Sequence, residues 1–192
     1  MKNLKSRFLI KVPKSISLIY CLNRQVLCIK NSQKSYLLDL KLKLRFIDCN
    51  TFYITNQGFA SFSSKDKNNL KRLRGTTRAL INKIIYQATY TCFKKLKLVG
   101  VGFKVLQKTL KNCNLEVIEF RLGYSHSIFF KVPKNVSIMC HKSNNIFIIG
   151  TSVDKVAQTA SIIRNYKVPE VYKGKGILYQ NEIITLKQGK KV

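Results

Sequence analysis

The chain has 192 residues, with 36 Lys and Arg against 8 Asp and Glu, and its formal net charge is +28. Its 45% apolar residues are enough for a hydrophobic core, which excludes disorder of the whole chain. So large a positive charge opposes compaction unless an anion neutralises it, and a polyanionic partner is therefore predicted. No membrane partner is expected, because apolar runs such as 127–130 and 146–150 are far too short to span a bilayer. Nucleic acid is the predicted polyanion.

A short segment near the N-terminus occurs a second time. Residues 12–18 and 132–138 both begin with Val-Pro-Lys, and the offset between them is 132 − 12 = 120 residues. The similarity continues at the same offset, without a gap, from residues 26–29 to 146–149. Each copy predicts an extended segment, a turn rich in Asn and Ser, and a strand. The repeat therefore predicts two related modules.

Three strands are predicted in the first module, at residues 36–40, 42–47 and 51–55, from runs of β-branched and apolar residues. Residues 63–74 follow as a predicted loop that has little to bury and carries five basic residues: Lys65, Lys67, Lys71, Arg72 and Arg74. This loop is either a solvated connector or, beside a helix N-terminus, a phosphate-binding segment.

Two helices are predicted from apolar residues at helical spacing. The first begins at Gly75 and Thr76 and runs to about Phe93, with an apolar face formed by Leu80, Ile81, Ile84, Ile85, Ala88 and Cys92. The second has Ser152 as its N-cap and Asp154 in its first turn, and it ends before Pro169. Its buried stripe is expected to contain Val153, Val156, Ala157, Ala160 and Ile163.

Further strands are predicted between the helices, at residues 96–106, 115–123 and 128–132. Strands outnumber helices, and no regular β-α-β alternation occurs. The predicted fold class is α+β, with two similar modules that each pack an antiparallel sheet against a helix. We place the boundary so that the first module and its basic loop comprise residues 1–74. The central helix and the second module then comprise residues 75–192.

The sequence shows no evident active site. Two histidines and eight scattered acids supply neither paired carboxylates for acid–base catalysis nor an acidic cluster for magnesium. The six cysteines include no Cys-x-x-Cys pair, so we interpret them as small apolar residues in a reducing compartment rather than as zinc ligands. Gly100-Val101-Gly102 lacks the third glycine of a dinucleotide fingerprint and is predicted to lie in a strand. We predict no enzyme activity, no cofactor and no metal site.

A glycine-lysine segment near the C-terminus has chemistry suited to RNA. Its five residues are Tyr172, Lys173, Gly174, Lys175 and Gly176. The glycines allow the backbone to approach a phosphate ribbon, the lysines neutralise that ribbon, and the tyrosine can stack or donate a hydrogen bond at its edge. The alternation of glycine and lysine is also typical of flexible basic loops.

Four motifs in order carry a family resemblance. Residues 169–177 resemble the signature of the ribosomal protein L6 family of the large subunit. Residues 75–82, 96–103 and 122–126 resemble the family's central helix start, the strand after it, and a glycine-aromatic-Ser-His element. The first module is similar more loosely, through Val12-Pro13. Ser127 stands where the family usually has a proline, and we expect it to loosen that turn.

The resemblance implies a structural constituent of the large ribosomal subunit, with two α+β modules joined by the central helix. It implies that the second module binds large-subunit rRNA close to the sarcin–ricin loop, near the docking site of translational GTPases and beside neighbouring ribosomal proteins. Residues 172–176 would form the principal RNA contact, with Arg164 and Lys167 as neighbours. A basic RNA-binding module outside the ribosome, such as an RNA chaperone, is the alternative.

The composition also bears on the source of the gene. The frequent residues Lys, Ile, Asn, Phe and Tyr have A- and T-rich codons, which favours an AT-rich genome. The first Val-Pro lies about where the family has its own, which leaves no room for a transit peptide in this expectation. We expect a mitochondrial ribosome, with a plastid or an AT-rich bacterial ribosome as alternatives.

Overall fold

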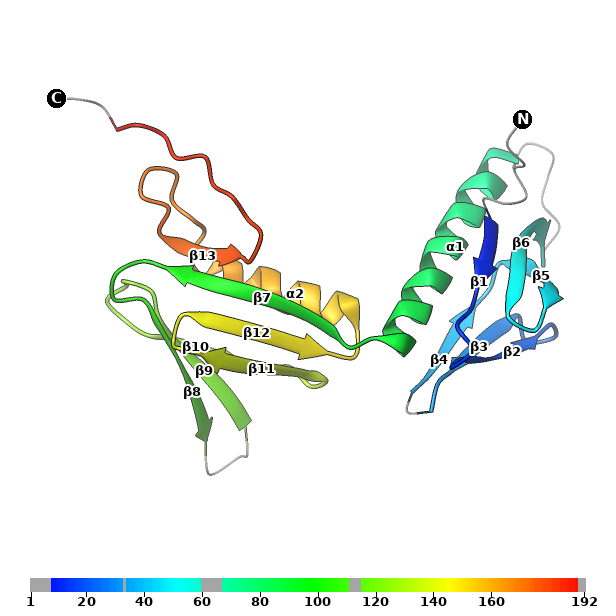
Figure 1. The fold of residues 1–192 in the computed structure, drawn as a ribbon, viewed down its shortest axis with the longest axis horizontal. Helices are drawn as coiled ribbons and strands as arrows, with labels where there is room; N and C mark the ends of the chain where they lie inside the picture. The colour runs from blue at the N-terminus through cyan, green and yellow to red at the C-terminus, as the bar shows by residue number, and fades with distance from the viewer. Residues whose placement is uncertain (1–7, 33, 60–66, 111–114, 190–192) are drawn as a thin grey trace. The chain divides into compact units, whose positions relative to one another are not determined.

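A computed structural model describes residues 8–32, 34–59, 67–110 and 115–189 (Figure 1). The chain divides into two compact units, unit 1 (Met1–Tyr90) and unit 2 (Thr91–Val192). Both units contain antiparallel sheets and one helix, which confirms the predicted α+β class. The two units are described separately below.

Unit 1 consists of two three-stranded sheets and one helix. Strands β2, β3 and β4 form one sheet in that order, and the second sheet has the order β1-β6-β5. Both sheets and α1 contribute to one apolar core, in which Leu27, Phe52 and Ile81 are fully buried. The elements are β1 (Leu9–Lys11), β2 (Ser17–Cys21), β3 (Val26–Lys30), β4 (Ser35–Asp39), β5 (Leu42–Asp48), β6 (Thr51–Gly58) and α1 (Lys67–Thr89).

Helix α1 begins nine residues earlier than predicted, at Lys67 instead of Thr76. Residues 67–74 of the predicted basic loop are therefore helical, and residues 63–66 lie outside the described residues. The reason is tertiary: Leu70 and Leu73 pack against the unit 1 core, and Arg74 Nε donates to the Ile54 carbonyl oxygen at 2.7 Å. Gly75, the predicted start, is an exposed glycine inside the helix.

The other end of the predicted helix also differs. Leu80 is 43% exposed, and Cys92 is the first residue of strand β7 and is buried in the core of unit 2. Because α1 packs on strands β3 to β6, the division between the units falls after Tyr90. It differs from the predicted boundary at 74/75 by the length of the helix.

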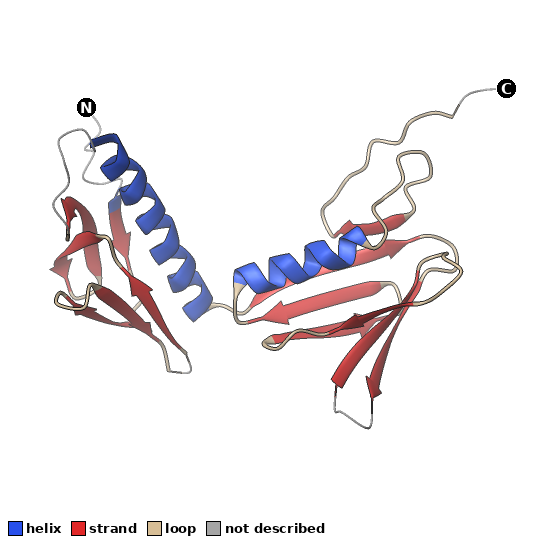
Figure 2. Cartoon of the chain, turned by 180° about the vertical axis from the view of Figure 1, so that it is seen from behind, coloured by secondary structure: helices blue, strands red, loops and turns tan. Residues whose placement is uncertain are grey.

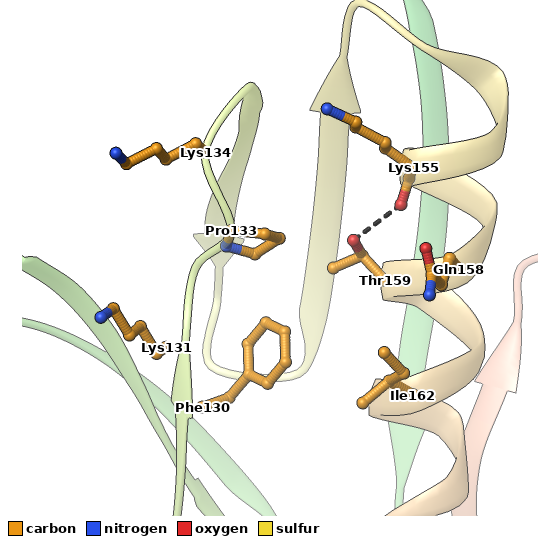
Figure 3. A pocket seen from close by; sticks show the side chains of 8 residues that line it. All are labelled: Phe130, Lys131, Pro133, Lys134, Lys155, Gln158, Thr159 and Ile162. Atoms are coloured by element: carbon orange, nitrogen blue, oxygen red, sulfur yellow. Dashed lines mark hydrogen bonds between the residues drawn. The ribbon is translucent and has the colours of Figure 1, made fainter.

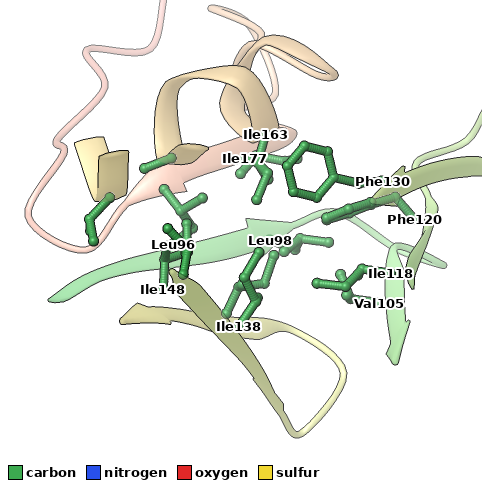
Figure 4. Packing of buried hydrophobic residues seen from close by; sticks show 14 of the residues in the cluster. Leu96, Leu98, Val105, Ile118, Phe120, Phe130, Ile138, Ile148, Ile163 and Ile177 are labelled. Carbon is green, nitrogen blue, oxygen red and sulfur yellow. The ribbon is translucent and has the colours of Figure 1, made fainter. Parts of the chain in front are cut away.

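Unit 2 has a four-stranded sheet of order β11-β12-β7-β13 and a three-stranded sheet of order β10-β9-β8. Helix α2 lies along one face of the larger sheet (Figure 2). Leu96, Ile148 and Ile163 meet in the core between them (Figure 4). The elements are β7 (Cys92–Val99), β8 (Lys104–Leu110), β9 (Leu115–Arg121), β10 (Ile128–Lys131), β11 (Val136–His141), β12 (Asn145–Gly150), α2 (Val153–Asn165) and β13 (Gly176–Tyr179).

Two details of unit 2 differ from the sequence predictions. Gly100 and Gly102 were expected inside one strand, but they lie in a turn that separates β7 from β8, and Gly102 has φ +80°. Helix α2 follows Ser152 as predicted, yet the Ser152 side chain makes no capping hydrogen bond. The buried face of α2 consists of Val156, Thr159, Ala160 and Ile163.

The sequence repeat forms the same hairpin twice. Ile16 N donates to the Pro13 oxygen at 3.1 Å, and Val136 N donates to the Pro133 oxygen at 3.3 Å. In the following turns, Cys21 pairs with Val26 across four residues, whereas His141 pairs with Asn145 across three. The second turn is thus one residue shorter.

This shorter turn corrects the alignment of the repeat. The buried residues of the second strand are Leu27 and Ile29 in unit 1 and Ile146 and Ile148 in unit 2. Their offset is 146 − 27 = 119, so the repeat has a one-residue gap and does not continue at 120. A slip of one residue would expose the buried set, which is why the length change lies in the turn.

Glu119 is a buried carboxylate in strand β9, with 3% of its surface exposed. Lys108 Nζ lies 2.6 Å from one carboxylate oxygen, and Arg121 Nε and the Ser127 hydroxyl donate to the other at 3.0 and 2.9 Å. These hydrogen bonds, that of Lys108 first, lower the pKa of Glu119 from 4.5 to about 2. Ser127 therefore ties the turn that it was expected to loosen.

A pH dependence of stability follows from Glu119. Because folding lowers the pKa of Glu119, the ionised carboxylate stabilises unit 2 above about pH 4.5, and this contribution is lost as the pH falls toward 2. We expect the free energy of unfolding of the wild type to fall more steeply over this range than that of Glu119→Gln. Urea unfolding at a series of pH values measures it, and parallel pH profiles would contradict the prediction.

Candidate nucleic-acid interface

Three segments that are distant in sequence meet at a shallow hollow of unit 2, with a volume of about 760 Å³. They are the turn after β7, the segment after β9 and the segment after α2. The hollow is lined by Val101, Phe103, Leu122, Gly123, Tyr124, Asn165, Tyr166, Lys167, Val168, Glu170 and Lys175. Two of the predicted RNA-binding residues, Lys167 and Lys175, are therefore brought together.

The glycine-lysine segment forms a closed loop beside this hollow. Gly174 N donates to the Glu170 oxygen at 2.9 Å, and Glu170 N donates to the Lys175 oxygen at 3.0 Å. Gly174 has φ +66°, a left-handed conformation that favours glycine. The loop leaves Lys173 exposed and Tyr172 58% exposed. Both side chains are thus available to an external partner.

Gly176 closes the base of the loop. It is buried, and a Cβ atom at this position would lie 2.6 Å from Pro169 Cα and 2.7 Å from Pro169 N. The next residue, Ile177, donates from its N to the Lys167 oxygen at 2.9 Å. The absence of a side chain at Gly176 therefore allows the chain to pack against itself, a different role from the predicted approach to phosphate.

Tyr124 is a member of this surface that was not predicted as a site residue. Lys167 Nζ lies 4.3 Å from the Tyr124 ring centroid, within the range of a cation–π contact. The Tyr124 hydroxyl donates to the Tyr166 oxygen at 3.0 Å, and its ring stacks on His126 with 6.2 Å between centroids. The Gly-Tyr-Ser-His motif was the sequence signal for this position.

Arg164 has a partner inside unit 2. Its guanidinium donates to both Glu182 carboxylate oxygens, at 3.2 and 2.5 Å, and Glu182 also accepts from Tyr179 N at 3.1 Å. The hydrogen bond from Arg164 lowers the pKa of Glu182. Arg164 thus holds the segment after β13 in place, instead of presenting a free cation beside Lys167.

Other site types were sought in the same residues. Among residues 8–32, 34–59, 67–110 and 115–189, no three His, Cys, Asp or Glu side chains cluster as metal ligands. The five cysteines described are free thiols, and Cys113 lies outside the described residues. Cys92 is buried as predicted, whereas Cys49 is exposed. No helix in the described part of the chain is long and apolar enough to cross a membrane.

A second hollow, of about 310 Å³, lies between the β10–β11 connection and helix α2 (Figure 3). Phe130, Pro133 and Ile162 supply its apolar surface, and three lysines lie around it. The Thr159 hydroxyl donates to the Lys155 oxygen at 2.7 Å and so is already paired. This hollow contains none of the predicted RNA-binding residues. The first hollow is therefore the candidate interface.

Comparison with known proteins agrees with this choice. A family model described as ribosomal protein L6 matches residues 99–180, which include every segment around the first hollow. The large ribosomal subunit protein uL6 of Parvibaculum lavamentivorans is 32% identical over 185 residues, which cover 96% of this chain and 97% of that protein. The chain belongs to the ribosomal protein L6 family.

Other relatives support the L6 assignment. The uL6 protein of Neisseria gonorrhoeae is 30% identical over 182 residues, with 95% of both chains covered. That of Mycoplasma pneumoniae is 42% identical over 120 residues, or 62% of both chains. The family resemblance seen in four short motifs is thus confirmed over most of the chain.

Gly176→Ala is expected to destabilise unit 2, because the new Cβ atom would overlap the Pro169 backbone. Overpacking of this kind costs about 1–3 kcal/mol. Gly75→Ala is the matched control: nothing lies within 4 Å of its Cβ position, and alanine is the better helix former by about 1 kcal/mol. Chemical denaturation should show opposite signs for the two variants. An unchanged stability of Gly176→Ala would contradict the close packing.

Glu182→Gln tests the role assigned to Arg164. Removing the carboxylate weakens the hold on the segment after β13, so we expect faster trypsin cleavage at Lys187 with little change in global stability. Arg164→Gln should give the same digestion pattern, because it removes the other half of the pair. If only Arg164→Gln weakened RNA binding while digestion stayed unchanged in both variants, Arg164 would act on RNA directly.

Proposed function

We propose that this L6-family chain is a structural constituent of the large ribosomal subunit that binds and organises its rRNA. The observation that carries the proposal is the convergence of the glycine-lysine loop, Lys167 and Tyr124 on one hollow of a chain with a net charge of +28. The uL6 proteins that it resembles are named for the large ribosomal subunit. The role is one of binding and scaffolding, without catalysis.

The geometry supports recognition of phosphates and shape. Lys173 and Lys175 flank Gly174 on a loop whose own backbone groups are paired, so the loop presents its charges without rearranging. Tyr172 is exposed beside them and can stack or donate a hydrogen bond. Neutralising phosphates in this way gives affinity that depends strongly on salt and weakly on base sequence.

The finer assignment places the loop near the sarcin–ricin loop of large-subunit rRNA, close to the site of translational GTPases. Neighbouring ribosomal proteins are the further partners. The AT-rich codon preference supports a mitochondrial ribosome, while the bacterial relatives are equally compatible with a plastid or bacterial one.

Sedimentation of the large subunit tests this function. Cells expressing Lys173→Glu with Lys175→Glu are compared with the wild type on high-salt gradients. We expect the wild-type chain to remain on the large subunit and the variant to stay at the top of the gradient. With purified chain and rRNA, the slope of log affinity against log salt should fall in magnitude by about 2 for two lost phosphate contacts.

Lys11→Glu with Lys14→Glu is the control, since it makes the same change of charge on exposed residues of unit 1. It should remain on the subunit in the same salt. If the wild type itself washes off, the chain is a basic RNA-binding protein outside the ribosome. If both double variants wash off equally, total charge and not the loop determines binding.

A further inference from the structure

The four-stranded sheet of unit 2 has one face against α2 and β8–β10, and a second face that we call the outer face. Strand β7 alternates between them: Leu96 and Leu98 point into the core, while Phe93, Lys95 and Lys97 point away from it. Figure 1 shows β7 inside this sheet, between β12 and β13. The outer face is therefore a continuous surface of four strands.

Strand register places apolar residues side by side on the outer face. Phe93 lies opposite Ile149, and in the next row Phe147 lies between Lys95 and Met139. Phe93 is 66% exposed and Met139 is 58% exposed. In a monomer, aromatic and methionine side chains gathered in this way on a sheet surface mark an interaction site. We call Phe93, Met139, Phe147 and Ile149 the apolar patch.

The charge around the patch has one sign. Lys95 lies in the patch's own rows, Lys97 follows on the same strand, and the sequences of the four strands contain no Asp or Glu. A partner that covers the patch must therefore bring carboxylates or leave these lysines uncompensated.

The composition of the patch favours a protein over RNA. Lys95 Nζ lies 5.1 Å from the centroid of the Phe147 ring, so the ring surface on which a base would stack already holds a cation. Ile149 and Met139 are not planar and give a base little to stack on. Aromatic residues and methionine around an apolar centre, with charge at the margin, are typical of the core and rim of a protein interface.

We propose that the outer face of unit 2 binds a neighbouring protein of the large subunit. That protein presents apolar side chains to Phe93 and Phe147, and Asp or Glu carboxylates to Lys95 and Lys97. The proposal rests on the proposed function, because it assumes that the chain resides in the large subunit. It gives the rRNA-binding unit a second partner surface, made of residues that do not line the hollow.

Carbodiimide coupling of intact large subunits tests the proposal, because the reagent joins a lysine amine only to a carboxylate in contact with it. Subunits from cells that express the wild-type chain are coupled, digested and analysed by mass spectrometry. We expect Lys95 or Lys97 to be linked to Asp or Glu of one other subunit protein. In a parallel sample, short-wavelength ultraviolet light should give no nucleotide adduct on Phe93 or Phe147.

Phe93→Glu is expected to lower the yield of this linked peptide at least about tenfold, the loss typical of a residue central to an interface. Leu37→Glu is the matched control: it places the same acid at a 74% exposed position of strand β4 in unit 1, and it should leave the yield unchanged. Links at other exposed lysines report that each variant is folded and in the particle.

Three results would overturn the inference. Nucleotide adducts on Phe93 or Phe147 would make the outer face an RNA surface. Unlinked Lys95 and Lys97, in a chain whose other lysines are linked, would leave the face uncovered. An equal loss of yield in both variants would show that the patch is not specific. A chain that does not sediment with large subunits would instead refute the proposed function, and this is measured before any coupling.

Discussion

Thirty-six cationic side chains share this chain with eight acidic ones, and their repulsion opposes folding until an anion is bound. Two of the acids hold unit 2 together from within. Glu119 is surrounded by Lys108, Arg121 and Ser127, and Glu182 engages Arg164 together with the backbone N of Tyr179. Because these carboxylates are occupied inside the fold, they do not compensate the cations of the RNA-facing loop. That charge is left for phosphate.

The strands followed from local sequence more closely than the helix ends did. Alternating apolar residues and a turn are sufficient to predict the repeated hairpin, because a hairpin needs only neighbouring residues. Helix α1 was predicted too short because Leu70 and Leu73 stand among basic residues, and their burial depends on distant strands. Cys92 continued the helical spacing but lies in β7, where its burial comes from the unit 2 core. Both errors arise from tertiary contacts that a local period does not contain.

The candidate interface divides in the same way. Lys173 and Lys175 could be predicted because the loop is contiguous, and its glycines indicated unusual backbone. The contact of Lys167 with Tyr124 joins residues 167 − 124 = 43 positions apart, and the Arg164–Glu182 pair spans 18. No pattern within one segment indicates either contact. The sequence therefore identified the charges of the surface but not the contacts that orient them.

The two units share a pairing scheme but not a chain order. In unit 1 the third strand follows the hairpin, and Val26 pairs with Asp39 only 39 − 26 = 13 residues later. In unit 2 the equivalent strand β7 precedes the hairpin, so Cys92 waits 150 − 92 = 58 residues for Gly150, and Leu96 waits 83 for Tyr179. During synthesis, unit 1 can fold while unit 2 is still emerging from the exit tunnel. Unit 2 is complete only when nearly the whole chain has been made, so its central strand is exposed longest to misfolding and aggregation.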